Sequence, residues 1–327
     1  MAVKYPGVSF IIPTHNEEKT IKFCLGSISK QDYDGKVEII LIDDKSADST
    51  CTIIKSVKHI GTLRLIKNKT NKGFAASVNR GISASRYDFV CLLEADCVLG
   101  NSGWLRNMVQ SLTNDPKLAT VRSSYTIPKV AWKNYNFWMK LFFIRLSKGY
   151  KVNKPVKTAN GIGRATLIRK SVFRKLGLLD EKTYRTGGED FDFSVRARMA
   201  GYSFITVPSI VYHYHGLKGN FTFRDYIYKR MQYAEIKGVL RRKFGDRMPL
   251  KRCSEIVYML LLLGLLIPQT FLLSILLLIL NSFYFTYLML FQERSYRLLY
   301  APFARLIGDV ASALWFLKGF LTNRQRI

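Results

Sequence analysis

Short apolar runs and longer amphipathic stretches alternate over residues 8–127. The apolar runs are Val8–Ile12, Val37–Ile42, Leu63–Ile66 and Phe89–Leu93. Runs of this length, rich in branched residues, are typical of strands buried on both faces of a sheet. The stretches between them predict helices over Glu17–Lys30, Asp48–Val57 and Phe74–Ala84. This alternation predicts βαβ units and an α/β fold with a mainly parallel sheet and flanking helices.

A further helix and strand are predicted later in the polar part of the chain. The helix covers Asp190–Ala200, and Gly201 is placed to end it as the residue just past its C-terminus. The strand Ser203–Val207 follows directly. The α/β domain is therefore expected to extend over residues 1–220.

The chain changes character at about Ser254. Ile256–Gln292 is a run of 37 residues without a charge. As a helix it would be about 55 Å long, nearly twice the roughly 30 Å hydrocarbon core of a bilayer. One interpretation is a tight hairpin of two short spans with a turn near Pro268–Thr270, and the other is a single tilted span with an interfacial piece. A buried core helix is disfavoured, because such helices rarely exceed about 25 residues.

Basic residues flank this apolar run on both sides. They are Arg241, Arg242, Lys243, Arg247, Lys251 and Arg252 before it, and Arg294, Arg297, Arg305, Lys318, Arg324 and Arg326 after it. Basic flanks favour the cytoplasmic side for both ends, and hence the hairpin. Residues 221–253 are predicted to form a basic helical linker at the membrane surface, and residues 254–327 to form membrane-associated helices.

The last predicted helix, Leu298–Leu321, is amphipathic. Arg305, Asp309 and Ser312 form one polar stripe at helical spacing. Such a helix lies at a membrane surface or packs on the hairpin.

The net charge narrows the range of partners. The chain has 51 Lys+Arg against 23 Asp+Glu, a formal charge of +28. This excess predicts an anionic partner, which could be nucleic acid, anionic lipid or a phosphorylated substrate. Nucleic acid is disfavoured, because acidic clusters at strand ends repel a phosphate backbone and because the tail is so apolar.

The beginning of the chain and its cysteines bear on localisation. Residues 1–20 are too polar for a signal peptide, and the five cysteines show neither a CxxC pair nor metal-ligand spacing. We therefore expect the polar domain on the cytoplasmic side of the cell membrane, in a reducing environment.

Polar clusters follow each of the first four predicted strands. They are Pro13-Thr14-His15-Asn16-Glu17, Asp43-Asp44-Lys45-Ser46, Asn71-Lys72-Gly73 and Glu94-Ala95-Asp96. Ligands bind outside the carboxyl ends of strands in open parallel sheets. The sequence therefore predicts a binding site where these clusters meet.

Two of the clusters carry acidic pairs with defined chemistry. The strand period places the carboxylates of Glu94 and Asp96 on one face, where they suit Mg²⁺ or Mn²⁺ bridging a diphosphate, although such a triplet is also common by chance. Asp43 and Asp44 could hold a nucleotide's base or ribose. They could also favour the N-terminus of the following helix, which Ser46 or Asp48 would cap.

Two later motifs have alternative interpretations as well. Asp190 follows Gly187-Gly188-Glu189 at a helix start, where it could be a general base with a pKa depressed by the helix dipole. The alternative is an ordinary capped helix with an Asp192–Arg196 pair. His213 and His215 could ligate a metal or could be plain edge residues of an aromatic strand.

Together, these motifs resemble the glycosyltransferase family two with its GT-A fold. The blocks occur in order over about residues 8–216. They are FIIPTHNEEKTIKFCLGSI, IILIDDKSADST, NKGFAASVNRGI, FVCLLEAD, NGIGRATLIRKSVFRKLGLLDE, GGEDFDFSVRARMAGY and VYHYHG.

The resemblance implies roles for individual residues. Asp190 matches the family's general base, and Asp96 matches its metal-binding acid. Glu94 stands where the family usually has Asp, and His213, with Gly216 three residues later, matches a histidine that completes the metal site. The nucleotide-sugar is implied to contact Pro13, Thr14, Asn16, Glu17, Asp44, Lys72, Gly73, Asn79, Glu94 and Arg164.

The resemblance also implies an activity. A sugar would pass with inversion from a UDP- or GDP-sugar, with Mn²⁺ or Mg²⁺ as cofactor, to a lipid-linked glycan or polysaccharide at an anionic membrane surface. Alternatives are a polyprenyl-phosphate sugar synthase and, from a different class, a non-catalytic membrane scaffold that kept the fold. The sugar, the base, the acceptor and the oligomeric state are not predicted.

Overall fold

The computed structural model describes residues 5–57, 61–147, 149–214, 221–248, 254–291 and 295–322. The chain forms two compact units. The sheet unit comprises residues 1–131, 148–182 and 189–218, and the helical unit comprises residues 132–147, 183–188 and 219–327. The two early segments of the helical unit lie within the range expected for the α/β domain, so a boundary at 220 does not by itself separate the units.

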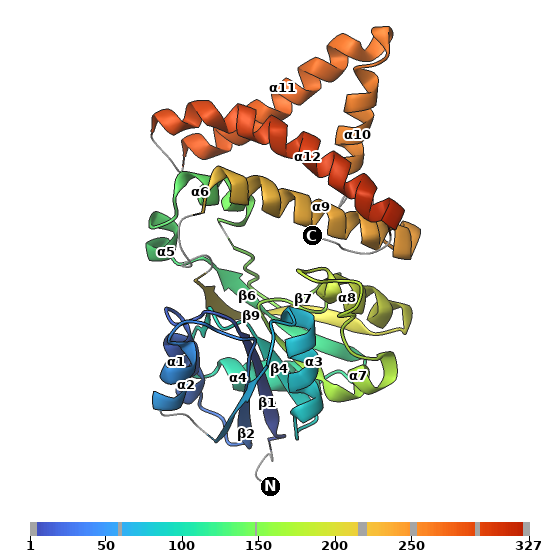
Figure 1. Ribbon diagram of the computed structural model, residues 1–327. Helices are drawn as coiled ribbons and strands as arrows, with labels where there is room; N and C mark the ends of the chain where they lie inside the picture. The colour runs from blue at the N-terminus through green and yellow to red at the C-terminus, as the bar shows by residue number, and fades with distance from the viewer. Residues whose placement is uncertain are drawn as a thin grey trace. The chain divides into compact units, whose positions relative to one another are not determined.

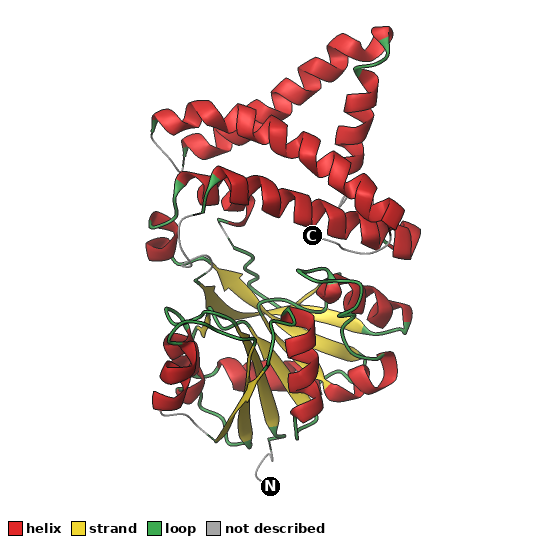
Figure 2. Ribbon diagram, in the orientation of Figure 1, coloured by secondary structure: helices red, strands yellow, loops and turns green. Residues whose placement is uncertain are grey.

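One sheet forms the sheet unit, in the strand order β3-β2-β1-β4-β8-β6-β9-β5, with β7 paired to β9 (Figure 2). The strands are β1 Val8–Thr14, β2 Val37–Asp43, β3 Thr62–Lys67, β4 Phe89–Leu93, β5 Cys97–Leu99, β6 Leu118–Thr126, β7 Val156–Lys157, β8 Ala165–Arg169 and β9 Ser203–His213. The first four strands in this order are parallel, as the βαβ pattern predicts. Beyond β4 the sheet is mixed, because β8 runs antiparallel to both β4 and β6.

Helices cover both faces of this sheet (Figure 1). They are α1 Ile21–Ser29, α2 Thr50–Ser56, α3 Phe74–Ala84, α4 Trp104–Thr113, α7 Lys170–Leu176 and α8 Glu189–Met199. Side chains of α1, α2 and α4 share one apolar core, and those of α3, α7 and α8 share the other. The strands supply both cores, since Phe10 and Ile12 of β1 face the first core and Ile11 faces the second.

Most predicted elements of the sheet unit are confirmed, with shifted ends. β4 and α3 have the predicted bounds, whereas α1 begins at Ile21 because residues 17–20 form a turn in which Glu17 O accepts from Thr20 N and Ile21 N. Gly201 ends α8 with a φ of 84°, a left-handed conformation that glycine adopts without strain. β9 is longer than predicted and extends to His213.

The helical unit contains α6 Phe137–Phe143, α9 Phe223–Phe244, α10 Ser254–Gly264, α11 Pro268–Leu290 and α12 Ala301–Thr322. The short helix α5 Lys129–Lys133 straddles the boundary with the sheet unit. Three 3-10 helices complete the set, η1 Ile144–Leu146, η2 Gly245–Arg247 and η4 Tyr296–Tyr300. α10 and α11 form a helical hairpin, and its turn lies at residues 265–267 instead of the expected Pro268–Thr270, because Pro268 is the first residue of α11, where proline is favoured.

Within the described residues, one helix is long and apolar enough to cross a membrane, Pro268–Leu290. Ser254–Gly264 is apolar but has 11 residues. Only 22% of the apolar window of α11 is buried, so α11 is not a core helix.

α9 and α12 pack closely enough for their backbones to touch. A Cβ atom on Gly238 would lie 2.1 Å from Phe316 O, and one on Gly319 would lie 2.1 Å from Glu235 O. The side of α12 that faces α9 carries the small or buried residues Ala304, Gly308, Ser312 and Gly319. The two glycines therefore set the distance between the helices.

Gly238→Ala is expected to lower the free energy of unfolding by about 1–3 kcal/mol, the usual cost of overpacking. Gly26→Ala is the matched control, because Gly26 lies in α1 and a Cβ there would meet nothing within 4 Å. The control should stabilise the protein by roughly 0.5–1 kcal/mol, since alanine is the better helix former. Chemical denaturation of both variants in detergent measures the difference, and equal stability of the two would contradict close packing at Gly238.

Candidate active site

Strand directions bring the predicted clusters to one edge of the sheet. β2, β1, β4 and β9 all end at this edge, and β8, which runs the opposite way, begins there. The strand ends carry Thr14, Asp43, Glu94 and His213, and Arg164 directly precedes β8. Asp44 and Glu94 lie two strands apart, or about 10 Å at the usual strand spacing.

Three of the predicted metal ligands lie together. One ligand atom from each of Glu94, Asp96, Cys97 and His213 lies within 4.8 Å of all the others. His213 Nε2 is 3.2 Å from Asp96 Oδ2 and 3.4 Å from Glu94 Oε2. Strand pairing explains the meeting, because the Glu94–Asp96 turn joins β4 to β5, and β5 pairs Cys97 with His213.

The donor set suits a hard divalent cation. Two carboxylates and an imidazole are ligands that Mn²⁺ accepts, and the carboxylates also suit Mg²⁺. Burial, followed by the nearby charges of Asp96 and Glu94, raises the pKa of the Cys97 thiol well above its ordinary value. This thiol is therefore neutral at physiological pH and a poor ligand.

Glu94 is also held by a basic partner. Arg164 Nη1 donates to both carboxylate oxygens of Glu94, at 2.9 and 3.1 Å. The antiparallel pairing of β4 and β8 places Leu93 beside Ala165. Glu94 and Arg164, the next residues beyond this pair, therefore face each other at the start of the site. Arg164 therefore orients the Glu94 carboxylate.

The carboxylate of Asp44 organises the loop that precedes α3. Its Oδ1 accepts from Asn68 Nδ2 and from the backbone N–H of Lys72, and its Oδ2 accepts from the N–H of Gly73, each at 2.8 Å. Gly73 adopts a φ of 89°, which brings this N–H into position. Asp44 thus fixes the Lys72–Gly73 backbone beside the place predicted for the nucleobase.

The loop after β1 is tied to the loop after β2. Asn16 N donates to Ser46 Oγ, Asn16 Oδ1 accepts from Ala47 N, and Glu17 N donates to Thr50 Oγ1. Pro13 and Thr14 lie within β1, and Thr14 Oγ1 donates to Ile42 O at 3.3 Å. The helix N-cap interpretation of Ser46 is wrong, because Ser49 is the N-cap of α2 and makes no side-chain cap bond.

Asp190 and Glu189 begin α8, and the charge of Glu94 acts on both of them. Burial raises the pKa of Asp190, and so does the charge of Glu94, whereas the Phe191 N–H, Arg164 and Arg122 oppose the shift. Burial, together with the Asp190 charge, raises the pKa of Glu189 to about 8. The expectation that the helix dipole depresses the pKa of Asp190 is therefore wrong, because desolvation outweighs the dipole.

Other parts of the α8 interpretation are confirmed. Asp192 is fully buried and accepts from Arg196 Nε at 2.6 Å, the predicted i,i+4 pair. Arg196 also donates to Leu176 O and Leu178 O, so this pair ties α8 to the segment after α7. Asp192 therefore has a structural role.

One predicted nucleotide contact, Asn79, is hydrogen-bonded within the protein. Asn79 lies buried on α3, where Nδ2 donates to Leu179 O and Glu181 Oε2 and Oδ1 accepts from Leu179 N. These bonds commit its amide to fixing the segment that follows α7. His215 and Gly216 lie outside the described residues.

Sequence reasoning missed Arg122 and Cys97. Arg122 lies in β6, which had not been predicted, and its charge acts on Asp190. Its Nη1 donates to Thr158 Oγ1 and Asn160 O, so the guanidinium is held in place. Cys97 directly follows Asp96 at the start of β5. The sequence feature that could have identified it is the short strand directly after the acidic triplet.

Glu189 predicts a pH-dependent stability. Ionising an acid whose pKa is higher in the folded protein than in the unfolded chain destabilises the folded protein. Stability therefore falls as the pH rises from the unfolded-state pKa to the folded-state pKa. For Glu189 this window runs from 4.5 to about 8. We expect the melting temperature of Glu189→Gln, relative to that of the wild type, to increase as the pH is raised from 5 to 8.5. Both proteins are measured without metal or nucleotide. Parallel melting profiles for the two proteins would contradict the raised pKa.

The fold and this group of residues define a glycosyltransferase with a GT-A fold. The protein-family model described as Glycosyl transferase family 2 matches residues 9–177, just over half of the chain. The chain belongs to this family.

Curated relatives share the same part of the chain. The poly-beta-1,6-N-acetyl-D-glucosamine synthase of Staphylococcus epidermidis (strain RP62A) is 27% identical over 177 residues, or 53% of this chain and 42% of the relative. The enzyme of the same name from Staphylococcus aureus (strain COL) is 27% identical over 199 residues, or 60% of this chain and 47% of the relative. The chain thus spans less than half the length of these relatives.

Solved structures share the fold more widely. The mannosyltransferase PcManGT from Pyrobaculum calidifontis, in complex with GDP-Man and Mn2+, matches with a TM-score of 0.60 and 22% identity, over 96% of this chain and 88% of its own. GalNAc-T7 with UDP, GalNAc and Mn2+ matches with a TM-score of 0.54 and 19% identity, over 73% of this chain and 51% of its own. At these identities the likeness concerns the fold alone.

Proposed function

We propose that this chain is an inverting glycosyltransferase that transfers a sugar from a nucleotide-diphosphate-sugar to a hydroxyl of a lipid-linked glycan or polysaccharide at the cytoplasmic membrane face. The observation that carries the proposal is the grouping of Glu94, Asp96 and His213 at the sheet edge that also holds Asp190. Two solved relatives, PcManGT in complex with GDP-Man and Mn2+ and GalNAc-T7 with UDP, GalNAc and Mn2+, support the donor class.

Different residues along the sheet edge bind the nucleoside, the metal and the phosphates. The base and ribose bind at Asp44 and the loop it fixes, about 10 Å from Glu94, a separation that suits a nucleoside diphosphate. Asp96, Glu94 and His213 would hold Mn²⁺ or Mg²⁺, and the cation would supply positive charge to stabilise a diphosphate leaving group. Arg164 orients Glu94 and adds positive charge beside the phosphates.

Asp190 accepts the proton of the acceptor hydroxyl. Its carboxylate bonds to the Phe191 N–H at 2.7 Å, which fixes one oxygen and leaves the other for the hydroxyl. The raised pKa makes it a stronger base than a free aspartate, while the charges of Arg164 and Arg122 favour its ionised form.

The first test is a thermal-shift screen of UDP-, GDP- and dTDP-sugars with and without Mn²⁺. A donor at 100 times its dissociation constant should stabilise the protein by about 2.7 kcal/mol. The proposal requires one donor class to bind with a dependence on Mn²⁺, and a lack of stabilisation by all three classes would contradict it.

The acceptor is tested separately with the donor so identified. Transfer to an oligosaccharide or a lipid-linked glycan supports the proposal. Transfer only to polyprenyl phosphate identifies a polyprenyl-phosphate sugar synthase, a candidate favoured by the apolar surface of the helical unit.

A further inference from the structure

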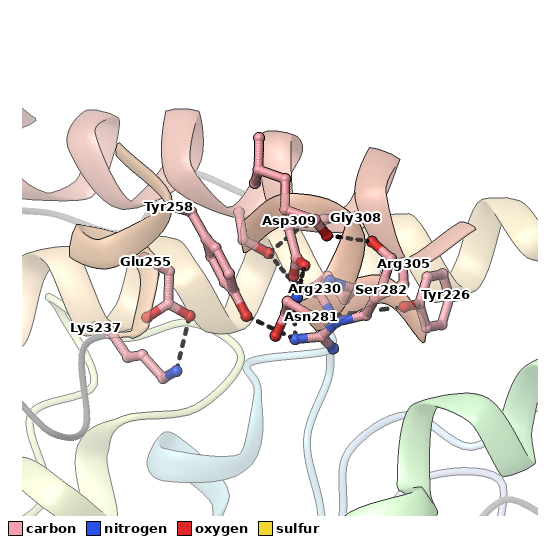
Figure 3. A network of polar contacts seen from close by, with 12 residues as sticks. Tyr226, Arg230, Lys237, Glu255, Tyr258, Asn281, Ser282, Arg305, Gly308 and Asp309 are labelled. Carbon is pink, nitrogen blue, oxygen red and sulfur yellow. Dashed lines mark hydrogen bonds and ion pairs between the residues drawn. The ribbon is translucent and has the colours of Figure 1, made fainter. Parts of the chain in front are cut away.

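A polar network joins the four long helices of the helical unit (Figure 3). Asp309 of α12 accepts from Arg230 of α9, from Arg305 Nη2 at 3.1 Å and from Asn281 Nδ2 of α11 at 2.8 Å. Arg305 Nη2 also donates to Tyr258 of α10 at 3.0 Å. Asp309 is 1% exposed, so this network forms a buried connection between the helices.

A second set of ion pairs lies on the same helices. Lys237 Nζ of α9 is 2.7 Å from Glu255 Oε1 at the start of α10, and Lys318 Nζ of α12 is 3.1 Å from Glu235 Oε1 of α9. Nine of the 22 residues of α9 are charged, and seven of these nine are basic. Charged side chains avoid the hydrocarbon core of a bilayer, so the basic α9 favours its surface.

Beyond the network, the α10–α11 hairpin carries no charge. Residues 259–280 contain no charged side chain, and their large apolar side chains point outward around the turn. The most exposed of them are Leu260 62%, Leu263 55%, Leu266 80%, Leu272 77%, Leu273 55% and Leu280 55%. An apolar surface of this size, beside a basic helix, fits the acyl chains and anionic headgroups of a lipid bilayer.

The position of Asn281 limits how deep the hairpin can go. It is the fourteenth residue of α11, so only the first 13 residues lie beyond the network on this side. On the other side, Leu266 at the turn lies eight positions after Tyr258. These lengths correspond to about 20 and 12 Å of helix, against roughly 15 Å for one half of the hydrocarbon core.

A complete crossing would move the charged helices with it. If α11 spanned the bilayer, the bonds from Asn281 to Asp309 and from Asp309 to Arg230 would draw α12 and the basic α9 into the hydrocarbon. In Figure 1, α10 and α11 meet at a tip that points away from α12, the arrangement of a wedge on a flat base.

We propose that residues 259–280 form a re-entrant wedge that enters a lipid bilayer from one side and ends inside it, with the polar network at the membrane surface. This goes beyond the proposed sugar transfer and does not depend on it. Both ends of the apolar run then lie on the same side, as the basic flanks predict, without any crossing.

The test measures the depth of single cysteines in the full chain. Cys51 and Cys253 are replaced by serine, and Cys24, Cys91 and Cys97 are buried. Leu266→Cys marks the tip, Leu260→Cys marks the base, and Met199→Cys, 57% exposed on α8, is the control on the sheet unit. Each is labelled with the environment-sensitive dye NBD and added to preformed phosphatidylcholine–phosphatidylglycerol vesicles containing lipids with a quencher at carbon 5 or carbon 14.

The wedge predicts that a dye at 266 is quenched best from carbon 14, a dye at 260 best from carbon 5, and a dye at 199 by neither. Unlabelled Leu266→Cys should resist a membrane-impermeant maleimide supplied outside or trapped inside the vesicles. Reaction with the trapped reagent would show a crossing and overturn the proposal. Reaction with the external reagent, or quenching at 260 deeper than at 266, would overturn it as well.

Discussion

Asp190→Asn is expected to lower the rate of single-turnover sugar transfer by about 10²–10⁴-fold, the usual contribution of a general base. This corresponds to roughly 3–5 kcal/mol of transition-state stabilisation. Asparagine keeps the oxygen that accepts from the Phe191 N–H, so α8 should remain intact, and only the proton acceptor is lost. Donor affinity, measured by titration with Mn²⁺ present, should change little, because the base acts in the chemical step.

Two controls separate chemistry from structure. Asp88→Asn removes a surface aspartate whose ion pair with Arg174 is exposed, and it should leave both transfer and stability unchanged. Asp192→Asn breaks the buried pair with Arg196, and it should lower the melting temperature. If Asp190→Asn transfers sugar within about tenfold of the wild type, well short of the expected range, the base lies elsewhere and Glu189 becomes the next candidate.

Asp96→Asn is expected to abolish the stimulation of transfer by Mn²⁺ or Mg²⁺. A bound metal contributes several kcal/mol of charge stabilisation, so a loss of at least about 10²-fold in metal-dependent turnover should follow. Asparagine offers a neutral oxygen in place of a charged ligand, next to Glu94 and His213. Metal titrations of turnover and of donor-induced thermal shift measure the effect.

Glu94→Asp and Cys97→Ser serve as comparisons at the same centre. Glu94→Asp keeps a carboxylate, although with a weaker contact to Arg164, and should retain turnover within about tenfold. Cys97→Ser should retain metal dependence, because the pKa of the buried thiol is raised well above its ordinary value and a neutral thiol is a poor ligand. Metal-dependent turnover of Asp96→Asn at the wild-type level would remove Asp96 from the metal site, and a loss in Cys97→Ser would place the sulfur in it.

Local sequence patterns predicted the first half of the sheet well. β1, β2, β3 and β4 follow from runs of apolar residues, and the polar clusters after them lie along one edge, as a parallel sheet requires. Parallel order is a local property here, since each βαβ unit places the next strand beside an earlier one.

The second half depended on contacts between distant residues. β8 reverses direction between β4 and β6, and this reversal brings Arg164 to Glu94 across 70 positions of the chain. Asn79 shows the same limit from the other side, because a hydrogen-bonding side chain on α3 was equally suited to a ligand and to Leu179. The raised pKa of Asp190 reflects burial by several elements, whereas the sequence displayed only the helix start.

The interleaving of the two units has a consequence for biosynthesis. Phe137, Leu141 and Ile144 pack in one core with Tyr226, Phe285 and Ala301, which are encoded much later. At about 5–20 residues per second, the ribosome needs roughly 10–30 s to add the residues between Phe137 and Ala301. During that interval the aromatic segment around Phe137 has been made but its packing partners have not. Nascent chains halted before α11 should therefore be prone to aggregate or to occupy chaperones, and the helical unit can be completed only after nearly the whole chain has been synthesised.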